Sequence, residues 1–469
     1  MASANAEKDI AEIYSGYAAN LTYASLPAEV VSTLKRIVLD TLGTTLAANT
    51  LGEGVQPLVE MARSAGGAAE STLIGFGQKV PAIMAALVNG GMAQALNYAD
   101  TAEWGGHLGP TSVPAALAVA ERAGRVSGKE FLAALAAGTE LQSRISRTFK
   151  LAAGDGPIKP LRTQLWGYFS AAVSAGRVLR LTQEEMHSAL GLALMQASGT
   201  MQVVQGGDPP AKAIYAAFPN HGGVLSALLS KQGLGARFSH LFEGEAGLFA
   251  LYHEGRFAPN VLEAELGKEF HLLGVRFKPW PVSGVVHSLL DAALQLAAKE
   301  QIDLASVERV QLRGGPEIGP FAEPAALRKR PATATAAANS IFFPVAKALV
   351  NLRLALDDFT PSGLRQPEVL RIAERMDYSI ERDLANSGIV EVTTTDGKRH
   401  VSRVDKPLGH LSRPLSYEQV VEKFLDCATH AARPLSPQKL QEVVERVDSL
   451  EQAPDVAALT RLLGSPLSL

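Results

Sequence analysis

The sequence predicts a mainly α protein, in which a large all-helical domain is interrupted by a smaller inserted α+β domain. Apolar residues recur at helical spacing through most of residues 8–265 and again from Ser416 onward. Between about 270 and 405 this pattern gives way to short alternating stretches, which are typical of half-buried strands. We therefore expect a helical domain built from residues 1–269 and 406–469, with an α+β domain at 270–405.

Segments with apolar residues at i, i+3 and i+4 make up the N-terminal part, and polar residues, glycines or prolines separate them. These segments are Val30–Ala48, Ile83–Leu96, Pro114–Ala123, Lys129–Arg147, Gly167–Leu181, Glu184–Ser198 and Val224–Lys231. Several are rich in alanine and glycine, which permits close approach of helices. This composition predicts either a compact bundle or a large interface between identical chains. We expect the C-terminal helical segments to pack back on this part.

The inserted region combines strand and helix patterns. Val307–Leu312 and Ile389–Thr394 alternate as strands, and an Asp-Gly turn after the second predicts a hairpin partner at Arg399–Val404. Helical patterns cover Ser288–Lys299 and Ala338–Ala355. This mixture predicts an α+β unit.

Composition excludes several classes of protein. Of the 469 residues 47% are hydrophobic and 19% are charged, which is typical of a globular chain. A net charge of −3 argues against a globally basic nucleic-acid binder. The single cysteine, Cys427, excludes an internal disulfide and a cysteine-based metal site. There is no secretion signal and no apolar run of membrane-spanning length, so we expect a soluble cytoplasmic protein without nucleic-acid or membrane partners.

The common cofactor motifs are missing. The sequence has no phosphate-binding GxxxxGK[ST] loop, and Gly75-Phe76-Gly77 lacks the third glycine of a dinucleotide fingerprint. It also lacks a GxSxG nucleophile elbow and the HExxH metal spacing. We therefore expect an enzyme that needs neither cofactor nor metal and works with side chains alone.

A short polar loop between two helical patterns is the most informative segment. Its polar residues are Asn97, Asp100, Thr101 and His107. Thr111 or Ser112 is expected to cap the next helix, whose free N–H groups suit a carboxylate or phosphate. An imidazole near such a terminus favours a functional site. The alternative is a connecting loop that satisfies only its own backbone.

Three further segments carry chemistry-bearing residues. Lys212 follows a rigid Asp-Pro-Pro turn, where a solvated surface charge is the alternative to a site residue. His287 ends the stiff FKPWPVSGVVH stretch and enters a helix. Glu140 and Arg144 interrupt an apolar helix at i,i+4 spacing, which favours a structural ion pair.

Taken in order, these segments resemble the MmgE/PrpD family. The resemblance covers nearly the whole chain and depends on the order of several weak motifs. They are VLDTLGTTLAA, NYADT with a histidine six residues later, GxExQxRI, AKAIYAAFPNHGGVLSALL, FKPWPxxxxxH, ANSIFFPVAKALV and LSYEQVVEKF. The resemblance implies a helical domain with an α+β lid, a homodimer and no cofactor. It also implies a site between the domains that binds a small di- or tricarboxylate.

The resemblance also implies particular site residues. The aspartate-rich loop of the family corresponds to Asn97, Asp100 and Thr101, and its loop histidine to His107. The family's basic lysine corresponds to Lys212 and its lid histidine to His287.

This chain departs from the family pattern in three places. Leu161-Arg162-Thr163 stands where many dehydratases and decarboxylases have His-Pro-Thr, and Val282-Ser283-Gly284 differs from the usual lid motif. Asn97 replaces a common aspartate.

We expect a cofactor-independent epimerase that moves a proton at a carbon next to a carboxylate of an iminodisuccinate-like acid. Losing one family histidine is easier to reconcile with epimerisation than with dehydration. His107 and Lys212 are the expected opposed acid/base groups, with Asp100 and Thr101 beside them in the catalytic loop. Carboxylate binding is expected from a second set, Asn97, His287, Lys278 and Arg162. The alternatives are a 2-methylcitrate-type dehydratase, a cis-aconitate-type decarboxylase and a catalytically silent binding protein.

Overall fold

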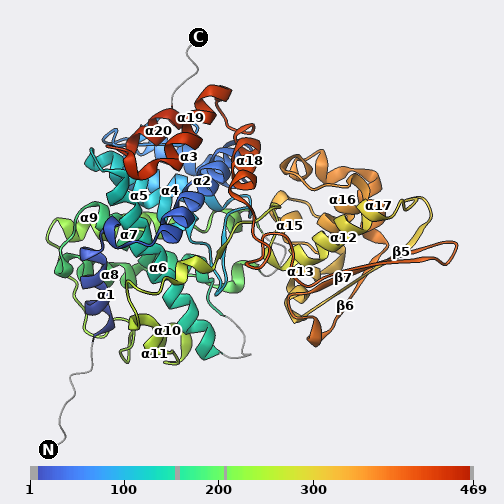
Figure 1. The fold of residues 1–469 in the computed structure, drawn as a ribbon, viewed down its shortest axis with the longest axis horizontal. Helices are drawn as coiled ribbons and strands as arrows, with labels where there is room; N and C mark the ends of the chain where they lie inside the picture. Colours follow the sequence, from blue (N-terminus) through green and yellow to red (C-terminus); the bar gives the residue numbers. More distant parts are fainter. Residues whose placement is uncertain (1–8, 154–158, 205–208, 465–469) are drawn as a thin grey trace, which may run out of the picture.

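A computed structural model describes residues 9–153, 159–204 and 209–464, and it confirms the mainly α fold. Figure 1 shows two lobes side by side. Each lobe has its own large hydrophobic core. The core of the helical lobe draws on residues 10–277 and 415–463, and that of the α+β lobe on residues 282–404. The domain limits at residues 269 and 405 stay predictions.

The helical lobe contains every segment predicted as helical in the N- and C-terminal parts. Its helices are α1 (Ile10–Asn20), α2 (Ala28–Leu51), α3 (Val55–Ser64), α4 (Ala82–Gln94), α5 (Gly109–Ala123), α6 (Gly128–Ala153), α7 (Arg162–Val178), α8 (Gln183–Gln196), α9 (Ala217–Lys231), α10 (Leu248–His253), α11 (Pro259–Glu263), α18 (Tyr417–Ala428), α19 (Pro437–Asp448) and α20 (Ala457–Gly464). Short 3₁₀ turns are η1 (Tyr23–Ser25), η2 (Met201–Val204), η3 (Pro210–Ile214), η4 (His271–Gly274) and η10 (Leu450–Gln452). Two short antiparallel ladders interrupt the helices, β1 (Ser71–Thr72) with β2 (Lys79–Val80) and β3 (Thr101–Ala102) with β4 (Val275–Arg276).

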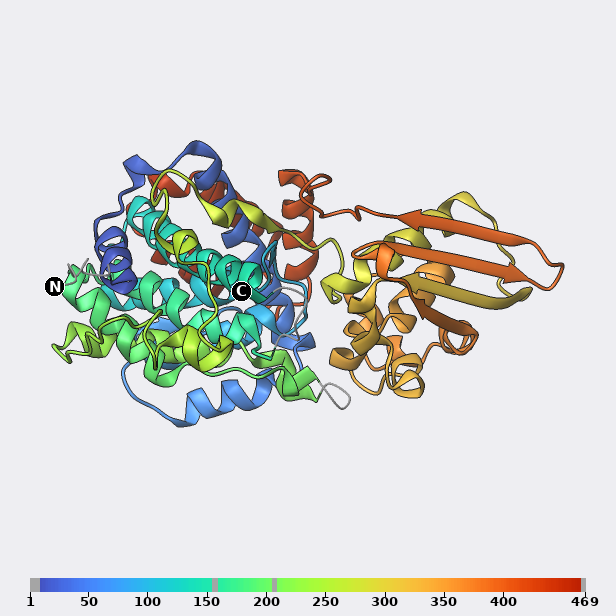
Figure 2. The same cartoon turned by 90° about the horizontal axis from the view of Figure 1, so that it is seen from below.

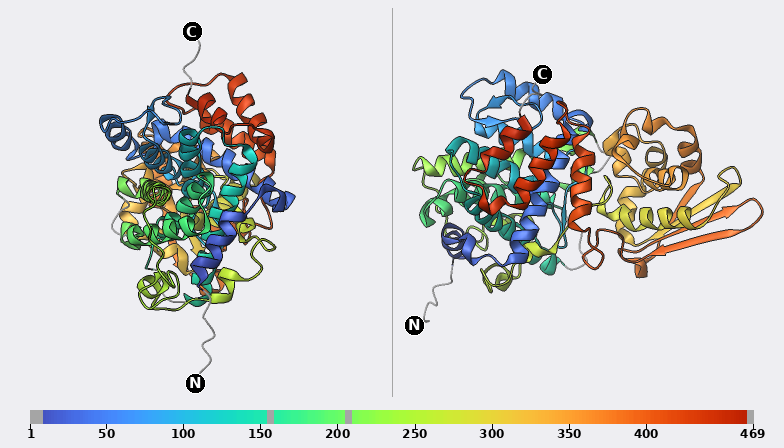
Figure 3. Two further views of the ribbon diagram at one scale, coloured as in Figure 1. Left: turned by 90° about the vertical axis from the view of Figure 1, so that its left-hand side faces the viewer. Right: turned by 45° about the horizontal axis from the view of Figure 1, so that its top comes forward.

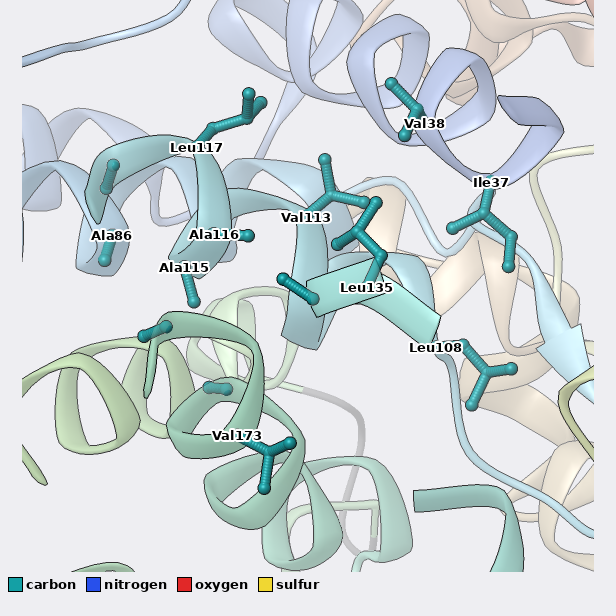
Figure 4. Packing of buried hydrophobic residues seen from close by; sticks show 14 of the residues in the cluster. Ile37, Val38, Ala86, Leu108, Val113, Ala115, Ala116, Leu117, Leu135 and Val173 are labelled. Atoms are coloured by element: carbon teal, nitrogen blue, oxygen red, sulfur yellow. The ribbon is translucent and has the colours of Figure 1, made fainter. Parts of the chain in front are cut away.

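Small residues let the central helices approach closely. Figure 4 shows α5 surrounded by side chains of α2, α4, α6 and α7, with Ala115 and Ala116 at the contacts. Between α7 and α9, a Cβ added to Gly223 would lie 2.4 Å from the Cβ of Ala171, so no larger residue fits there. The alanine and glycine bias therefore reflects a compact bundle. The large interface between identical chains stays a prediction.

The C-terminal helices return to the helical lobe. Both α18 and α19 contact α2, and Figure 3 shows them lying along it. Phe424 of α18 packs so close to Gly43 of α2 that an added Cβ would lie 3.1 Å from the Phe424 Cα. This return brings the polar residues of α18 to the same end of the lobe as the inserted α+β part.

The α+β lobe contains a four-stranded sheet in the order β6-β5-β7-β8. Its strands are β5 (Val307–Gly314), β6 (Met376–Ile380), β7 (Gly388–Thr394) and β8 (Arg399–Val404). The predicted strands and hairpin are confirmed, and β6, which pairs parallel with β5, was not predicted. Helix α12 (His287–Lys299) packs on β5, β7 and β8, and Figure 2 shows the helices on one side of the sheet. The exposed opposite face explains the alternating sequence pattern.

The other helices of this lobe are short. They are α13 (Gly319–Ala322), α14 (Ala325–Lys329), α15 (Ala334–Ala338), α16 (Phe342–Asn351) and α17 (Pro367–Glu374), with 3₁₀ turns η5 (Gly284–Val286), η6 (Pro316–Ile318), η7 (Leu356–Phe359), η8 (Gly363–Arg365) and η9 (Arg382–Leu384). The single helix predicted at Ala338–Ala355 is wrong in extent. The Ser340 hydroxyl accepts hydrogen bonds from the Phe342 and Phe343 N–H groups, so a new helix begins there and ends at Asn351.

Candidate functional site between the two lobes

A cavity of about 280 Å³ lies between the lobes. The helical lobe contributes Asn97, His107, Arg162, Thr163, Lys212 and Tyr215, among others. The α+β lobe contributes Pro281, Ser283, Phe321, Ala334, Thr335, Ala338, Asn339, Leu356 and Phe359. Four predicted site residues, Asn97, His107, Arg162 and Lys212, therefore line one cavity. The other four, Asp100, Thr101, Lys278 and His287, are not among its lining residues.

Asp100 determines how the polar loop meets helix α5. Its carboxylate accepts hydrogen bonds from the Leu108 and Gly109 N–H groups, both at 2.7 Å. The helix therefore begins at Gly109, and the expectation that Thr111 or Ser112 caps it is wrong. Both hydroxyls lie inside the helix and donate to preceding backbone carbonyls or to a glutamine instead. A carboxylate from elsewhere in the loop has taken the capping position.

The same contacts change the expected role of the α5 N-terminus. Because Asp100 occupies it, this terminus is not offered to a substrate carboxylate. Asp100 is fully buried, and burial followed by repulsion from Asp40 raises the pKa of its carboxyl to about 7. Thr101 lies beside it in β3, paired with Arg276 of β4. Both residues thus shape the loop from behind the cavity.

His107 lines the cavity as a neutral imidazole. Its Nδ1 lies within hydrogen-bonding distance of the Asp100 carbonyl. A carbonyl can only accept, so Nδ1 carries the proton and Nε2 keeps its lone pair. Burial, together with the positive charge of Lys278, lowers the pKa of His107 to about 3. Gln142 holds the backbone of this residue by donating to the His107 carbonyl at 2.8 Å.

Lys278 acts on the cavity through Asn97. Its ammonium donates to the Asn97 carbonyl at 2.7 Å and to the Asn97 side-chain oxygen at 3.1 Å. This contact directs the other end of the Asn97 amide toward Asn339 of the α+β lobe, at 3.4 Å. Burial, followed by repulsion from Lys423, lowers the pKa of Lys278 to about 7. Lys278 therefore orients Asn97, a cavity residue of the helical lobe whose side chain contacts the α+β lobe.

Arg162 and Lys212 bring positive charge to the cavity wall. Arg162 is the first residue of α7, which begins five residues before the expected Gly167, and it donates to the Trp104 carbonyl at 2.8 Å. Lys212 lies in η3 and is 8% exposed, so the alternative of a solvated surface charge is wrong. The Gly206-Gly207-Asp208 stretch before it lies outside the described residues.

His287 lies behind the wall. It begins α12, is 5% exposed and makes an edge contact with the Trp280 ring at 5.6 Å between centroids. Burial, followed by repulsion from Lys278, lowers the pKa of His287 to about 3. Pro281 and Ser283 of the same segment line the cavity instead.

The sequence interpretation missed a buried ion pair that joins the site segments. The Lys423 ammonium of α18 lies 2.7 Å from Asp40 Oδ1 and donates to the Tyr98 carbonyl at 2.6 Å and the Lys278 carbonyl at 3.0 Å. Asp40 Oδ2 accepts the Asp100 N–H at 3.0 Å. The sequence contained a signal for both Asp40 and Lys423, since each of these charged residues interrupts a largely apolar helical face.

That signal had correctly predicted one pair elsewhere. Arg144 Nε lies 2.7 Å from Glu140 Oε1, and both side chains are buried, as expected for a structural ion pair. Arg144 also donates to the Val261 and Ala264 carbonyls, and Glu140 accepts the Leu272 N–H. These bonds tie α6 to the chain that leads into the α+β lobe.

Glu53 was also missed, although it lines the cavity. Its carboxylate accepts the Ala334 N–H at 2.9 Å and the Thr335 N–H at 3.0 Å, and it contacts the Thr335 hydroxyl. It therefore joins the turn after α2 to α15 across the lobes. Tyr215 follows Lys212 on the same short turn and is buried with it. Tyr215 lies in the quoted AKAIYAAFPNHGG motif but carries no pattern of its own that marks it as functional, and Glu53 lies outside the quoted motifs.

Two properties hold for the part of the chain that the structure describes. No three His, Cys, Asp or Glu side chains gather there in a way that could hold a metal ion. None of its helices combines the length and the apolar character that crossing a bilayer requires.

Comparison with known proteins agrees with this architecture. The profile of the MmgE/PrpD N-terminal domain matches residues 12–259, and that of the MmgE/PrpD C-terminal domain matches residues 280–449. The chain is 24% identical over 502 residues to a cis-aconitate decarboxylase of Aspergillus terreus, covering 99% of this chain and 98% of that protein. It is 26% identical over 481 residues to the cis-aconitate decarboxylase of Homo sapiens, covering 98% and 95% of the two chains. With both of its domain profiles matched in order, the chain belongs to the MmgE/PrpD family.

Proposed function

We propose that this protein is an enzyme that binds a small polycarboxylate between its lobes and moves a proton at a carbon next to a carboxylate. One observation carries the proposal: a neutral imidazole, His107, lines the same cavity as the cations Arg162 and Lys212. The cations suit the carboxylates of a substrate, and the imidazole suits the transfer of a proton.

A bound polycarboxylate raises the pKa of His107 and so makes the imidazole a better base. The pKa of this imidazole is about 3, which makes it a weak base. A substrate with two or three carboxylates adds negative charge beside the ring and so raises its pKa toward neutrality. Negative charge that develops on the substrate during the reaction is stabilised by Arg162 and Lys212. The Nδ1 contact with Asp100 keeps the ring oriented meanwhile.

Among the reactions that use this step, we place decarboxylation of a cis-aconitate-type acid first. The named relatives that match nearly the whole chain are cis-aconitate decarboxylases. In such a step the carbon–carboxylate bond breaks, CO₂ leaves, and the electron pair stays on carbon. A proton then adds to this carbon or, where the pair is delocalised through the neighbouring C=C bond, to the far end of that allylic system; Lys212 or protonated His107 is the proposed donor.

Epimerisation of an iminodisuccinate-like acid is the second candidate. Leu161 stands where many dehydratases and decarboxylases of the family have a histidine, so one proton carrier of those reactions is missing from this chain. An epimerase needs only two proton carriers on opposite faces of one carbon, and His107 and Lys212 are the proposed pair. A 2-methylcitrate-type dehydratase would need another acid for the departing hydroxyl.

Deuterated water separates these reactions. The purified protein is incubated in D₂O with cis-aconitate or with one enantiomer of iminodisuccinate, and products are followed by NMR. A decarboxylase releases CO₂ and gives a product that carries one new carbon-bound deuterium. An epimerase gives the epimer, inverted and labelled at one α-carbon, with no CO₂ and no new double bond.

A panel of further di- and tricarboxylates, including 2-methylcitrate, is screened in the same way. If no polycarboxylate in the panel is turned over, labelled or bound, the proposal fails. Binding without turnover or labelling would instead support the catalytically silent alternative.

The remaining expectations belong to the same proposal. We propose a homodimer in the cytoplasm that needs no added cofactor. Sedimentation measures the oligomeric state, and activity after dialysis against a chelator tests whether a metal is needed.

A further inference from the structure

The two lobes differ in the charge that they contribute to the cavity wall, although apolar side chains come from both. Four of the described lining residues have acidic or basic side chains: Glu53, His107, Arg162 and Lys212. All four belong to the helical lobe. The α+β lobe contributes no charged side chain to the described lining. It presents Phe321, Leu356 and Phe359 instead, together with small residues and the polar Ser283, Thr335 and Asn339.

The apolar side chains that line the cavity lie at the edges of separate hydrophobic clusters. Phe321 and Phe359 pack at the edge of the α+β core, and Leu356 belongs to a small cluster with Tyr98. On the side of the helical lobe, Met201 packs against Leu161 at the cavity. Each of the three clusters thus has partly buried apolar side chains at the cavity, with Leu51 and Leu96 serving for the cluster of the buried Leu356.

The exposure of these rings differs from that of their neighbours. Phe342 and Phe343 in the interior of the α+β lobe are 0% exposed, whereas Phe321 and Phe359 are only partly buried. Water that lies against apolar surface in a cavity has few hydrogen-bonding partners. Replacing this water by an alkyl group is favourable.

Glu53 makes a further anion unfavourable near the α+β wall. It is the one carboxylate among the described lining residues, and its oxygens already accept hydrogen bonds from α15. A substrate carboxylate placed near it would meet a like charge. An uncharged group meets no such repulsion.

We infer that the natural substrate is a polycarboxylate that carries an alkyl substituent of several carbons. Its carboxylates face Arg162 and Lys212, and its alkyl chain contacts Phe321, Leu356 and Phe359. The carboxylate half of this inference rests on the proposed function. The alkyl half rests on the wall contributed by the α+β lobe.

Calorimetric titration of four inert ligands tests the inference. The ligands are succinate, 2-methylsuccinate, 2-propylsuccinate and 2-pentylsuccinate, which share two carboxylates and differ in chain length. We expect the dissociation constant to fall about fourfold for each added methylene until the chain fills the cavity. The heat capacity change of binding should become more negative along the series.

A matched pair of variants locates the alkyl site. Phe321→Ala is expected to weaken 2-pentylsuccinate binding at least tenfold while leaving succinate binding within twofold. Phe238 is 41% exposed and is not among the described lining residues, so Phe238→Ala should leave the whole series unchanged. The wild-type series stands on its own if Phe321→Ala fails to fold.

The outcomes separate this inference from the proposed function. If succinate and its derivatives all fail to bind, the carboxylate site itself is contradicted. If succinate binds but 2-pentylsuccinate binds no more than twofold tighter than 2-methylsuccinate, only the alkyl inference is overturned. A steep series that Phe321→Ala flattens supports both.

Discussion

The side chains of the cavity wall and the polar groups behind them come from the same short segments. The two layers differ in the partners to which their polar atoms bond. Asn97, His107 and Arg162 line the cavity, while Asp100 and Lys278, from the same or neighbouring segments, are buried and are not among its lining residues. The rear groups bond to one another and to backbone groups of the site loop. The front groups keep a surface available to a ligand. A polar residue in a site motif can therefore belong to the cavity wall or to the layer behind it. Only its hydrogen-bond and ion-pair partners show to which layer it belongs.

The largest expected effect concerns the front layer. Replacing His107 by alanine removes the proposed proton carrier, and such groups contribute roughly 10²- to 10⁴-fold to a rate. We expect turnover to fall by about that factor, with the thermal unfolding midpoint changed by only a few degrees. His240, whose side chain is 40% exposed, provides the matched control. A loss of less than tenfold in His107→Ala, or an equal loss in His240→Ala, would remove His107 from the chemistry.

The second effect concerns the rear layer. Lys423→Met leaves Asp40 buried without its cation, which typically destabilises a protein by about 3–5 kcal/mol. Urea unfolding should show this loss. The control is Arg446→Met on α19, which removes an exposed i,i+4 pair with Glu442 and should cost roughly 0.5 kcal/mol or less.

A second replacement tests the cause of that loss. Adding Asp40→Asn to Lys423→Met removes the uncompensated charge and should restore part of the stability. If Lys423→Met costs no more than Arg446→Met, the two layers do not differ as we describe.

The smallest expected effect is on the pH dependence of the free energy of unfolding. His287 has a pKa of about 3 in the folded protein, against roughly 6.5 when unfolded. The unfolded state therefore binds more protons between these values, so stability from this residue is fully present above pH 6.5 and is lost as pH falls toward 3. Between pH 6.5 and 5 the loss is about 2 kcal/mol.

The variant His287→Gln should lose less stability between pH 7 and 5 than the wild type, by about that amount. His107 adds a slope of the same sign, whereas Asp100, with its raised pKa, contributes the opposite slope near pH 4–7. The comparison of two chains cancels both. An unchanged slope in His287→Gln would mean that this histidine is not buried and neutral.

Sequence patterns predicted much of the site but could not divide it into layers. The loop from Asn97 to His107 was recognised because polar residues interrupt two apolar helical patterns. Asp40 and Lys423 were passed over, although each lies in a quoted motif, because a charge on a helix is usually solvated. Their pairing joins residues 383 positions apart in the chain (423 − 40), which no local pattern reports.

Local patterning determined the helices, the hairpin of the α+β lobe and the family to which the chain belongs, because periodicity and turn residues act over a few positions. Tertiary structure alone decided that Asp100 caps α5, that Lys212 is buried, and that the α+β lobe offers an uncharged wall to the cavity. These features depend on which distant groups meet when the lobes pack. The free energy of a buried charge is fixed by its partners in space rather than by its neighbours in sequence.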